Sequence, residues 1–334
     1  MKINNLIIQP GAVRMLLALT VVFYHISKFV FIGSFAVHVF FILSGYWVSK
    51  MYYEKYVHMD KTLFKFYSSR VFRIFPLYLF VSFITYTVKL IIDNSFIEVI
   101  INYTLSDWLS ILMLFGFDNK SLLLGPAWSL DIELQFYLIV PLLIYIFNKR
   151  YLVIVTFIIS VIVLIIARVY PRFFYFEGLI LYLPYFILGM IIYLNKIKTS
   201  KFMIFTGLFL FLTILSLHYF IPVLSKLVLY GSNAYLETLN MILPIFLIPF
   251  ISFNVLQKSN KFDRHLGNLS YTVYLFHWTL LIPYSYYFAD LSFSNRIPYA
   301  LIYLFCVVLG SLIIYQLFEK PIEKMRKNFL IKRS

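Results

Sequence analysis

Residues 151–167 read YLVIVTFIISVIVLIIA, an apolar run without a single charged side chain. A helix needs about 20 predominantly apolar residues to cross the roughly 30 Å of hydrocarbon in a bilayer, and this run lies within the usual range. Because backbone polar groups in lipid must be paired within the segment, we predict that it is helical. We place ten such transmembrane helices, at residues 13–31, 35–53, 75–92, 128–147, 151–167, 178–194, 202–221, 236–255, 271–289 and 297–318.

The composition of the whole chain agrees with a membrane protein. Of its 334 residues, 62% are hydrophobic and 13% are charged, whereas a soluble domain has about a quarter of its residues charged. No linker rich in Pro, Gly and Ser, internal repeat or low-complexity tract marks a second domain. We therefore expect an all-α polytopic membrane protein that forms one domain over residues 1–334.

Lys and Arg are distributed unevenly over the connections between these spans. If the N-terminus is cytoplasmic, the connections on that side carry 20 of the 29 Lys and Arg residues, and the opposite connections carry 5. Cytoplasmic loops retain positive charge, so we predict that both the N and C termini are cytoplasmic. We attribute the formal net charge of +15 to contact with anionic membrane lipids and expect no nucleic acid partner.

Residues 96–117 are more polar than the ten spans. Asn102 and Asp107 interrupt the apolar residues, and Trp108 stands in the middle of the segment, as an interfacial anchor does. We interpret the segment as amphipathic or re-entrant. An eleventh span is the alternative, but it would disrupt the alternation of charge in the connections that follow.

Ionisable side chains inside membrane spans are costly, so each is a candidate functional residue. Arg14 and His25 lie eleven residues apart on the first span. In a helix this spacing is about 20° more than three full turns and rises roughly 16 Å, so both side chains lie on one face. One groove could then bind an anionic group near Arg14 and carry out proton chemistry at His25. Packing with a hydrogen bond is the alternative for His25, and it is the interpretation that we prefer for His38 and His277.

Two further groups of polar residues lie at predicted helix ends. Arg70 and Arg73 stand three residues apart before Pro76, and they are either positive-inside anchors or a clamp for a phosphate-bearing ligand. The fourth span opens with a dense polar cluster. Its members are Trp128, Ser129, Asp131, Glu133 and Gln135. One carboxylate there could simply oppose the helix dipole, whereas two carboxylates and an amide favour a functional site.

Together with their neighbours, these residues resemble the acyltransferase type 3 family of membrane O-acyltransferases. Six motifs carry the resemblance in family order: Arg14 with His25, FFILSGY at 40–46, RVFRIFPLY at 70–78, WSLDIELQFY at 128–137, LGNLSYTVYLFH at 266–277 and EKP at 319–321. Three positions depart from the family pattern. Tyr46 replaces a Phe, Ser69 replaces an adjacent arginine, and Leu134 replaces a second glutamate, so any carboxylate role falls to Glu133.

The resemblance implies an enzyme that moves an acyl group, commonly acetyl from acetyl-CoA, to a hydroxyl of a surface glycan such as lipopolysaccharide O-antigen. Arg14, Arg70 and Arg73 would bind the phosphates of the donor from the cytoplasmic side, and the acceptor would approach past Trp128 and Glu133. His25 would act as the general base, with Glu133 as the second catalytic residue. Substrate binding or structural support would fall to a further set, namely Ser44, Trp128, Ser129, Asp131, Tyr271 and His277. No metal is expected.

The resemblance also sets the cellular context and the alternatives. We expect a multi-pass protein of the bacterial inner membrane whose partners are acetyl-CoA, a glycan or lipid-linked glycan and membrane lipids. Some larger family members carry a soluble esterase-like domain after the membrane part, and we expect none here. The acceptor could instead be a small hydroxylated metabolite or a lipid. A transporter or flippase for a glycan-lipid is the competing class, because charged residues in spans also mark transport paths.

Overall fold

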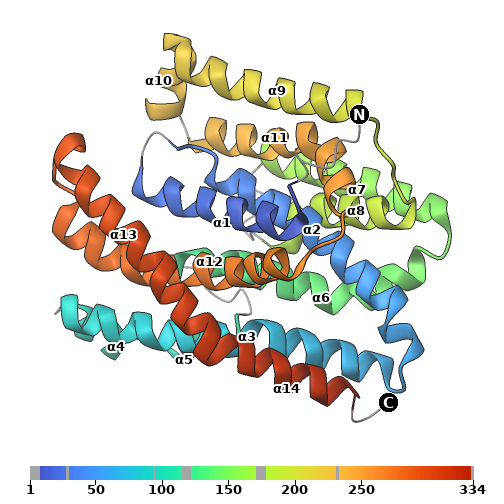
Figure 1. Cartoon of the computed structure of the whole chain (residues 1–334), viewed down its shortest axis with the longest axis horizontal. Helices are drawn as coiled ribbons and strands as arrows, with labels where there is room; N and C mark the ends of the chain where they lie inside the picture. The colour runs from blue at the N-terminus through green and yellow to red at the C-terminus, as the bar shows by residue number, and fades with distance from the viewer. Residues whose placement is uncertain are drawn as a thin grey trace. The chain divides into compact units, whose positions relative to one another are not determined.

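The computed structural model describes residues 8–27, 30–93, 95–114, 122–170, 178–230 and 233–331. Within these ranges the chain is helical and contains no strand (Figure 1). It divides into two compact units, each built from two segments of the chain. The first unit comprises Met1–Trp47 and Pro184–Ser270, and the second comprises Val48–Leu183 and Tyr271–Ser334.

The first unit contains the N-terminal helices and the helices of the 184–270 segment. These are α1 (Pro10–Ile26), the first part of α2 (Gly33–Glu54), most of α8 (Leu179–Leu194), α9 (Lys201–Phe220), α10 (Pro222–Tyr230), α11 (Asn233–Asn254) and the beginning of α12 (Lys261–Phe288). Helix α9 lies alongside α11 (Figure 1). Helices α2 and α8 approach through small residues. A Cβ atom added to Gly45 would lie 2.0 Å from the Phe186 carbonyl oxygen, and one added to Gly189 would lie 2.0 Å from that of Ile42. The glycines therefore permit the backbone contact.

The second unit contains the remaining helices. These are the rest of α2, α3 (Thr62–Ile92), α4 (Phe96–Ile101), α5 (Leu105–Met113), α6 (Trp128–Ile146), α7 (Arg150–Val169), the beginning of α8, the rest of α12, α13 (Phe293–Ile314) and α14 (Lys320–Ile331). Short 3₁₀ turns occur at Tyr56–His58 and Gly125–Ala127, and a π-helical turn at Tyr315–Glu319 joins α13 to α14. Helix α14 lies along α3 (Figure 1), where the Phe329 ring packs near the rings of Phe64 and Phe72.

Each of the ten predicted spans coincides with a helix. Among the described residues, six helical stretches are long and apolar enough to cross a membrane: 62–92, 125–146, 151–169, 201–220, 234–254 and 293–330. Helices α1 and α8 are apolar but shorter. A multi-pass membrane protein is therefore supported, while the count of ten spans and the cytoplasmic position of both termini stay predictions.

The first predicted span, 13–31, ends too late, because α1 ends at Ile26. The largest differences are three helices that extend beyond their predicted spans. Helix α3 begins at Thr62 instead of Phe75 and continues through Pro76, so Arg70 and Arg73 lie within a helix. Helix α12 begins ten residues before its predicted span, and the last span continues through the π-helical turn into α14. In all three cases the additional turns carry charged residues, which the apolar-run criterion cannot include.

The segment 96–117 forms two short helices within its described residues. The break between α4 and α5 is stabilised by a capping box, in which Thr104 and Asp107 each bond the backbone N–H of the other. Neither helix is long enough to cross a bilayer. Residues 115–117 of this segment, and residues 28 and 29 of the first predicted span, lie outside the described residues.

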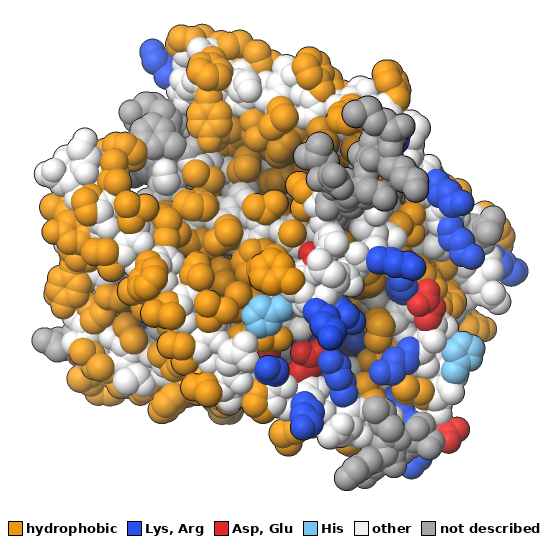
Figure 2. Space-filling view, viewed as in Figure 1, with side chains coloured by type: hydrophobic (Ala, Val, Ile, Leu, Met, Phe, Trp, Pro, Cys, Tyr) orange, Lys and Arg blue, Asp and Glu red, His pale blue; other side chains and the backbone are white. Residues whose placement is uncertain are grey.

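The outer surfaces of the helices are strongly apolar. On α7 and α9, many hydrophobic side chains are more than half exposed, among them Ile158, Ile165, Phe205 and Phe209. Hydrophobic side chains likewise dominate the face drawn in Figure 2. Such extensive exposed apolar surface is unfavourable in water and favourable against lipid, which agrees with a membrane location.

Candidate active site

Helix α1 carries both candidate residues of the first motif. It runs without interruption from Pro10 to Ile26, so Arg14 and His25 belong to one helix, as predicted. Both side chains are partly buried. His25 lies in the last turn, with its ring 5.0 Å from that of Tyr24. The helix thus presents a cationic group near its N-terminal end and an imidazole at its C-terminal end.

Helix α2 carries the second motif, and the structure assigns most of that motif to packing. Phe41 stacks on Phe186 at 4.7 Å, and Gly45 makes the close contact with the backbone of α8. Ser44 is partly buried beside this contact. His38 is 3% exposed, with its ring 4.6 Å from that of Tyr185. This environment fits the packing interpretation of His38.

The polar residues that open α6 separate into two groups. Ser129 Oγ donates to the Pro126 carbonyl oxygen at 2.9 Å and lies 2.7 Å from Tyr274 Oη. The fourth motif is thereby bonded to the fifth. Trp128 lies beside them, with its ring 5.4 Å from that of Tyr182. Ser129 and Tyr274 therefore hold the beginning of α6 against α12.

The two carboxylates of α6 have different partners. Asp131 is buried, and Gln135 donates to it at 3.0 Å while accepting a bond from the Leu179 N–H at the start of α8. Glu133 is only partly buried, and Tyr137 Oη donates to its Oε1 at 2.6 Å. Asp131 thus belongs to the anchoring of α8, and Glu133 is the more accessible carboxylate.

Arg70 lies in an aromatic environment on α3. Its Nη2 donates to Tyr56 Oη at 3.2 Å, and its Cζ lies 5.4 to 5.8 Å from the ring centroids of Tyr56, Phe66 and Tyr137. Burial raises the pKa of the Tyr56 hydroxyl. The charges of Arg70 and Lys55 and the hydrogen bonds with Ser69 and Arg70 lower it by more, so this pKa lies below its usual value. Since Tyr137 also bonds Glu133, one tyrosine contacts both the arginine and the carboxylate.

Arg73 joins three of the motifs through a buried carboxylate. Its Nη1 lies 3.1 Å from Glu319 Oε1, and Thr272 Oγ1 donates to Glu319 Oε2 at 2.5 Å. The Arg73 Cζ also lies 5.2 Å from the ring centroid of Tyr271, whose hydroxyl donates to the Ile74 carbonyl oxygen. Residues of α3, of α12 and of the π-helical turn therefore meet at one ion pair.

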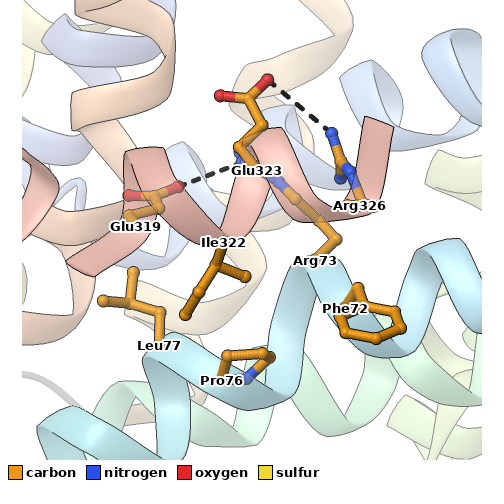
Figure 3. A pocket seen from close by; sticks show the side chains of 8 residues that line it. All are labelled: Phe72, Arg73, Pro76, Leu77, Glu319, Ile322, Glu323 and Arg326. Carbon is orange, nitrogen blue, oxygen red and sulfur yellow. Dashed lines mark hydrogen bonds and ion pairs between the residues drawn. The ribbon is translucent and has the colours of Figure 1, made fainter. Parts of the chain in front are cut away.

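A shallow pocket at the surface lies beside this ion pair. Figure 3 shows Arg73 reaching from α3 toward Glu319 of the π-helical turn and toward Glu323 and Arg326 of α14. Apolar side chains complete the lining: Phe72, Pro76, Leu77 and Ile322. Arg326 lies 3.8 Å from Glu323, an ion pair longer than a hydrogen bond, so the pocket holds two guanidinium groups, each facing a carboxylate, above an apolar floor.

His277 is fully buried in the second unit. The His277 Nδ1 lies 3.2 Å from the Val273 carbonyl oxygen. The backbone carbonyl oxygen of His277 accepts a hydrogen bond from Tyr303 Oη. The neighbouring rings are Tyr274 and Trp278. These contacts fit the packing interpretation.

Comparison with known proteins identifies the family. Residues 8–316 match the family described as Acyltransferase domain, which is nearly the whole chain. The chain belongs to this acyltransferase family. It is also similar to the O-acetyltransferase OatA of two Staphylococcus aureus strains, NCTC 8325 / PS 47 and COL, with 29% identity over 169 residues. Each alignment covers 46% of this chain and 28% of OatA. No solved structure matches the chain.

For this acyltransferase, sequence reasoning missed several residues that organise the site. Tyr137 and Glu319 stand in motifs that were recognised, yet neither received a role. Thr272 carries no signal at all, because a threonine in an apolar helix is ordinary. A buried ion-pair partner for Arg73 could have been sought among the few acidic residues near predicted span ends, and Glu319 is one of these.

Proposed function

We propose that this acyltransferase moves an acetyl group from cytoplasmic acetyl-CoA to a hydroxyl of a sugar in a surface polysaccharide such as lipopolysaccharide O-antigen. The family assignment supports acyl transfer, and the name of the OatA relatives supports O-acetylation. The proposal includes a bacterial inner-membrane protein with ten spans and both termini in the cytoplasm. It also treats residues 1–334 as one membrane acyltransferase domain.

The observation that carries the proposal is the arrangement of cations in the second unit. Arg70 and Arg73 lie one turn apart on α3, and Arg73 borders the pocket that Arg326 also lines. Guanidinium groups present forked N–H donors that match phosphate oxygens. A donor that carries several phosphates, as acetyl-CoA does, would bind beside these arginines, of which Arg73 faces Glu319 and Arg326 faces Glu323. In the first unit, Arg14 is proposed to contribute in the same way.

His25 is proposed as the general base. It takes the proton of the acceptor hydroxyl while the hydroxyl oxygen attacks the thioester carbonyl. The carbon–sulfur bond then breaks, and the imidazolium returns this proton to the sulfur, so coenzyme A leaves as the thiol. A positioned general base typically contributes 10² to 10⁴ in rate. Glu133, which Tyr137 holds by one carboxylate oxygen, is proposed to orient the acceptor together with Trp128.

The test is mass spectrometry of the surface polysaccharide from cells that carry the wild-type gene, no gene or the His25→Ala gene. We expect an acetyl mass increment only with the wild-type gene. His58→Ala is the matched control, because His58 is exposed on a 3₁₀ turn and has no place in the mechanism. Immunoblots of the membrane fraction would check that each variant is inserted.

Two outcomes contradict the proposal in different ways. A polysaccharide that is identical with and without the gene would remove the proposed acceptor. Full acetylation by a His25→Ala enzyme would keep the reaction but remove His25 from the mechanism.

A further inference from the structure

Helix α1 begins without a cap of its own. The residue before it, Gln9, makes no side-chain capping bond, and no acidic residue stands in the first turn. The first N–H groups of a helix have no partner within the helix, and leaving them unpaired in a buried position is costly. Pro10 at the first position removes one of these donors, but those of Gly11 and Ala12 remain.

The carboxylate of Asp263, which lies in the second chain segment of the first unit, accepts hydrogen bonds from these donors. The Gly11 N–H donates to Asp263 Oδ2 at 3.0 Å, and the Ala12 N–H donates to Asp263 Oδ1 at 2.7 Å. Asp263 stands in the first turn of α12 and is 3% exposed. One side chain therefore caps α1 from a position about 250 residues away in the sequence. Its negative charge also faces the positive end of the helix dipole.

Additional bonds hold the same end of α1. Asn254 Nδ2 donates to the Ile8 carbonyl oxygen at 2.6 Å, and the Asn260 N–H donates to Gln9 Oε1 at 3.3 Å. Asn260 Oδ1 in turn accepts the N–H of Asp263 at 2.7 Å. The carboxylate is therefore itself oriented, and the chain before α1 is bonded to the same segment.

The backbones of α1 and α12 are also in close contact at two glycines. A Cβ atom on Gly11 would lie 1.8 Å from the Asp263 carbonyl oxygen, and one on Gly267 would lie 3.0 Å from Gly11 Cα. The same atom on Gly267 would lie 4.0 Å from Arg14 Cδ, so Arg14 extends beside Gly267. The cap thus fixes α1 within one turn of Arg14.

We propose that Asp263 is a positioning residue, which holds α1 by its first turn and thereby sets the positions of Arg14 and His25. This inference rests on the proposed function, since the two side chains need accurate placement only if they serve the reaction. A continuous helix transmits a shift or rotation of its first turn to residues farther along it. Small errors in the placement of reacting groups cost large factors in rate.

The first experiment tests the cap without any assay of activity. Hydrogen–deuterium exchange of the purified full chain in lipid nanodiscs would follow the peptide that contains Gly11 and Ala12. Asp263→Ala should raise exchange there about tenfold, a factor within the range for loss of a helix cap. Asp263→Asn keeps one acceptor oxygen and should give a smaller rise. Unchanged exchange in both variants would overturn the cap.

A matched control exists in the same unit. Asn240 is also 3% exposed, and it caps α2 from α11 by accepting the Phe35 N–H at 2.8 Å while donating to the Phe31 carbonyl oxygen at 2.9 Å. Asn240→Ala removes a comparable cap from a helix that carries neither Arg14 nor His25. It should raise exchange at the start of α2 and leave α1 unchanged.

The second experiment tests the positioning role through the kinetics of thiol release from acetyl-CoA, with the host polysaccharide as acceptor. Asp263→Ala should raise the KM for acetyl-CoA about tenfold, and Asp263→Asn should restore part of the affinity. Asn240→Ala should leave this KM at the wild-type value. In an Arg14→Ala background, Asp263→Ala should add little, because a residue that acts through another shows non-additive effects.

The outcomes separate the two levels of the proposal. Fully additive effects of Arg14→Ala and Asp263→Ala, or an equal KM change in Asn240→Ala, would overturn the positioning role while acetyl transfer stands. If the wild-type enzyme releases no thiol from acetyl-CoA, the proposed function fails and the positioning role fails with it. The exchange experiment would still establish the cap.

Discussion

Replacing Glu319 with Gln removes the negative charge that faces Arg73 and keeps the shape of the side chain. The ion pair has a short contact of 3.1 Å, and the two side chains are only 19% and 8% exposed. Thr272 donates to the second carboxylate oxygen, which holds Glu319 in place. The substitution therefore leaves a largely buried guanidinium without the carboxylate that directly contacts it.

The geometry sets the size of the expected effect. Two charges about 4 Å apart attract by about 4 kcal/mol at an effective dielectric constant of 20. Desolvation offsets part of this, and breaking a buried pair from one side typically costs about 3–5 kcal/mol. Because Arg73 keeps some contact with solvent, we expect Glu319→Gln to lower the free energy of unfolding by about 3 kcal/mol.

The assay is a double-mutant cycle of Arg73→Met, Glu319→Gln and the double variant, unfolded in mixed micelles with increasing denaturing detergent. A coupling energy of about 2 kcal/mol or more is expected. Lys327→Met is the control, since Lys327 is 62% exposed and its pair with Glu323 at 2.9 Å should contribute less than about 1 kcal/mol. A coupling energy below about 0.5 kcal/mol would refute the reasoning, and Arg73 would then be held by other contacts.

Two further predictions concern other contacts. Gly45→Ala should destabilise the first unit by about 1–3 kcal/mol, measured by thermal unfolding, because the added Cβ would lie 2.0 Å from the Phe186 carbonyl oxygen. Tyr137→Phe should reduce acetylation of the polysaccharide while lowering the free energy of unfolding by no more than about 1.5 kcal/mol, because it removes the donor to Glu133 and keeps the ring beside Arg70. A variant that is fully active would show that the carboxylate needs no such support.

The helices could be predicted from the sequence because the length of an apolar run is a local property. Residues 151–167 form the larger part of α7, and the predicted span at 202–221 is shifted by one residue from α9. Errors arose where a helix continues past its apolar part. Helix α3 continues through Pro76, and its N-terminal turns carry Lys65, which is buried, and Arg70, which is partly buried beside aromatic rings.

The organisation of the site could be predicted only in part. The motifs identified Arg70, Arg73, Glu133 and His25 as candidate site residues. They contain no information about which side chains form hydrogen bonds or ion pairs with one another. The pair of Arg73 with Glu319 spans 246 positions in the sequence. The sequence likewise does not show that the Gly11 and Ala12 N–H groups take Asp263 as their acceptor, because any helix without a cap has such unpaired N–H groups. Only the folded chain shows which acidic residue meets them.

These contacts change how a loss of activity should be interpreted. Ser129 holds the start of α6 against Tyr274, and Asp131 takes part in the bonds that anchor α8, so their substitution would disturb the fold as well as any substrate contact. An inactive Ser129→Ala or Asp131→Asn variant would therefore not identify a catalytic residue. Glu133 is more informative, because it is only partly buried and accepts a hydrogen bond from Tyr137 on its own helix. Activity lost without a change in the free energy of unfolding would then point to the chemistry itself.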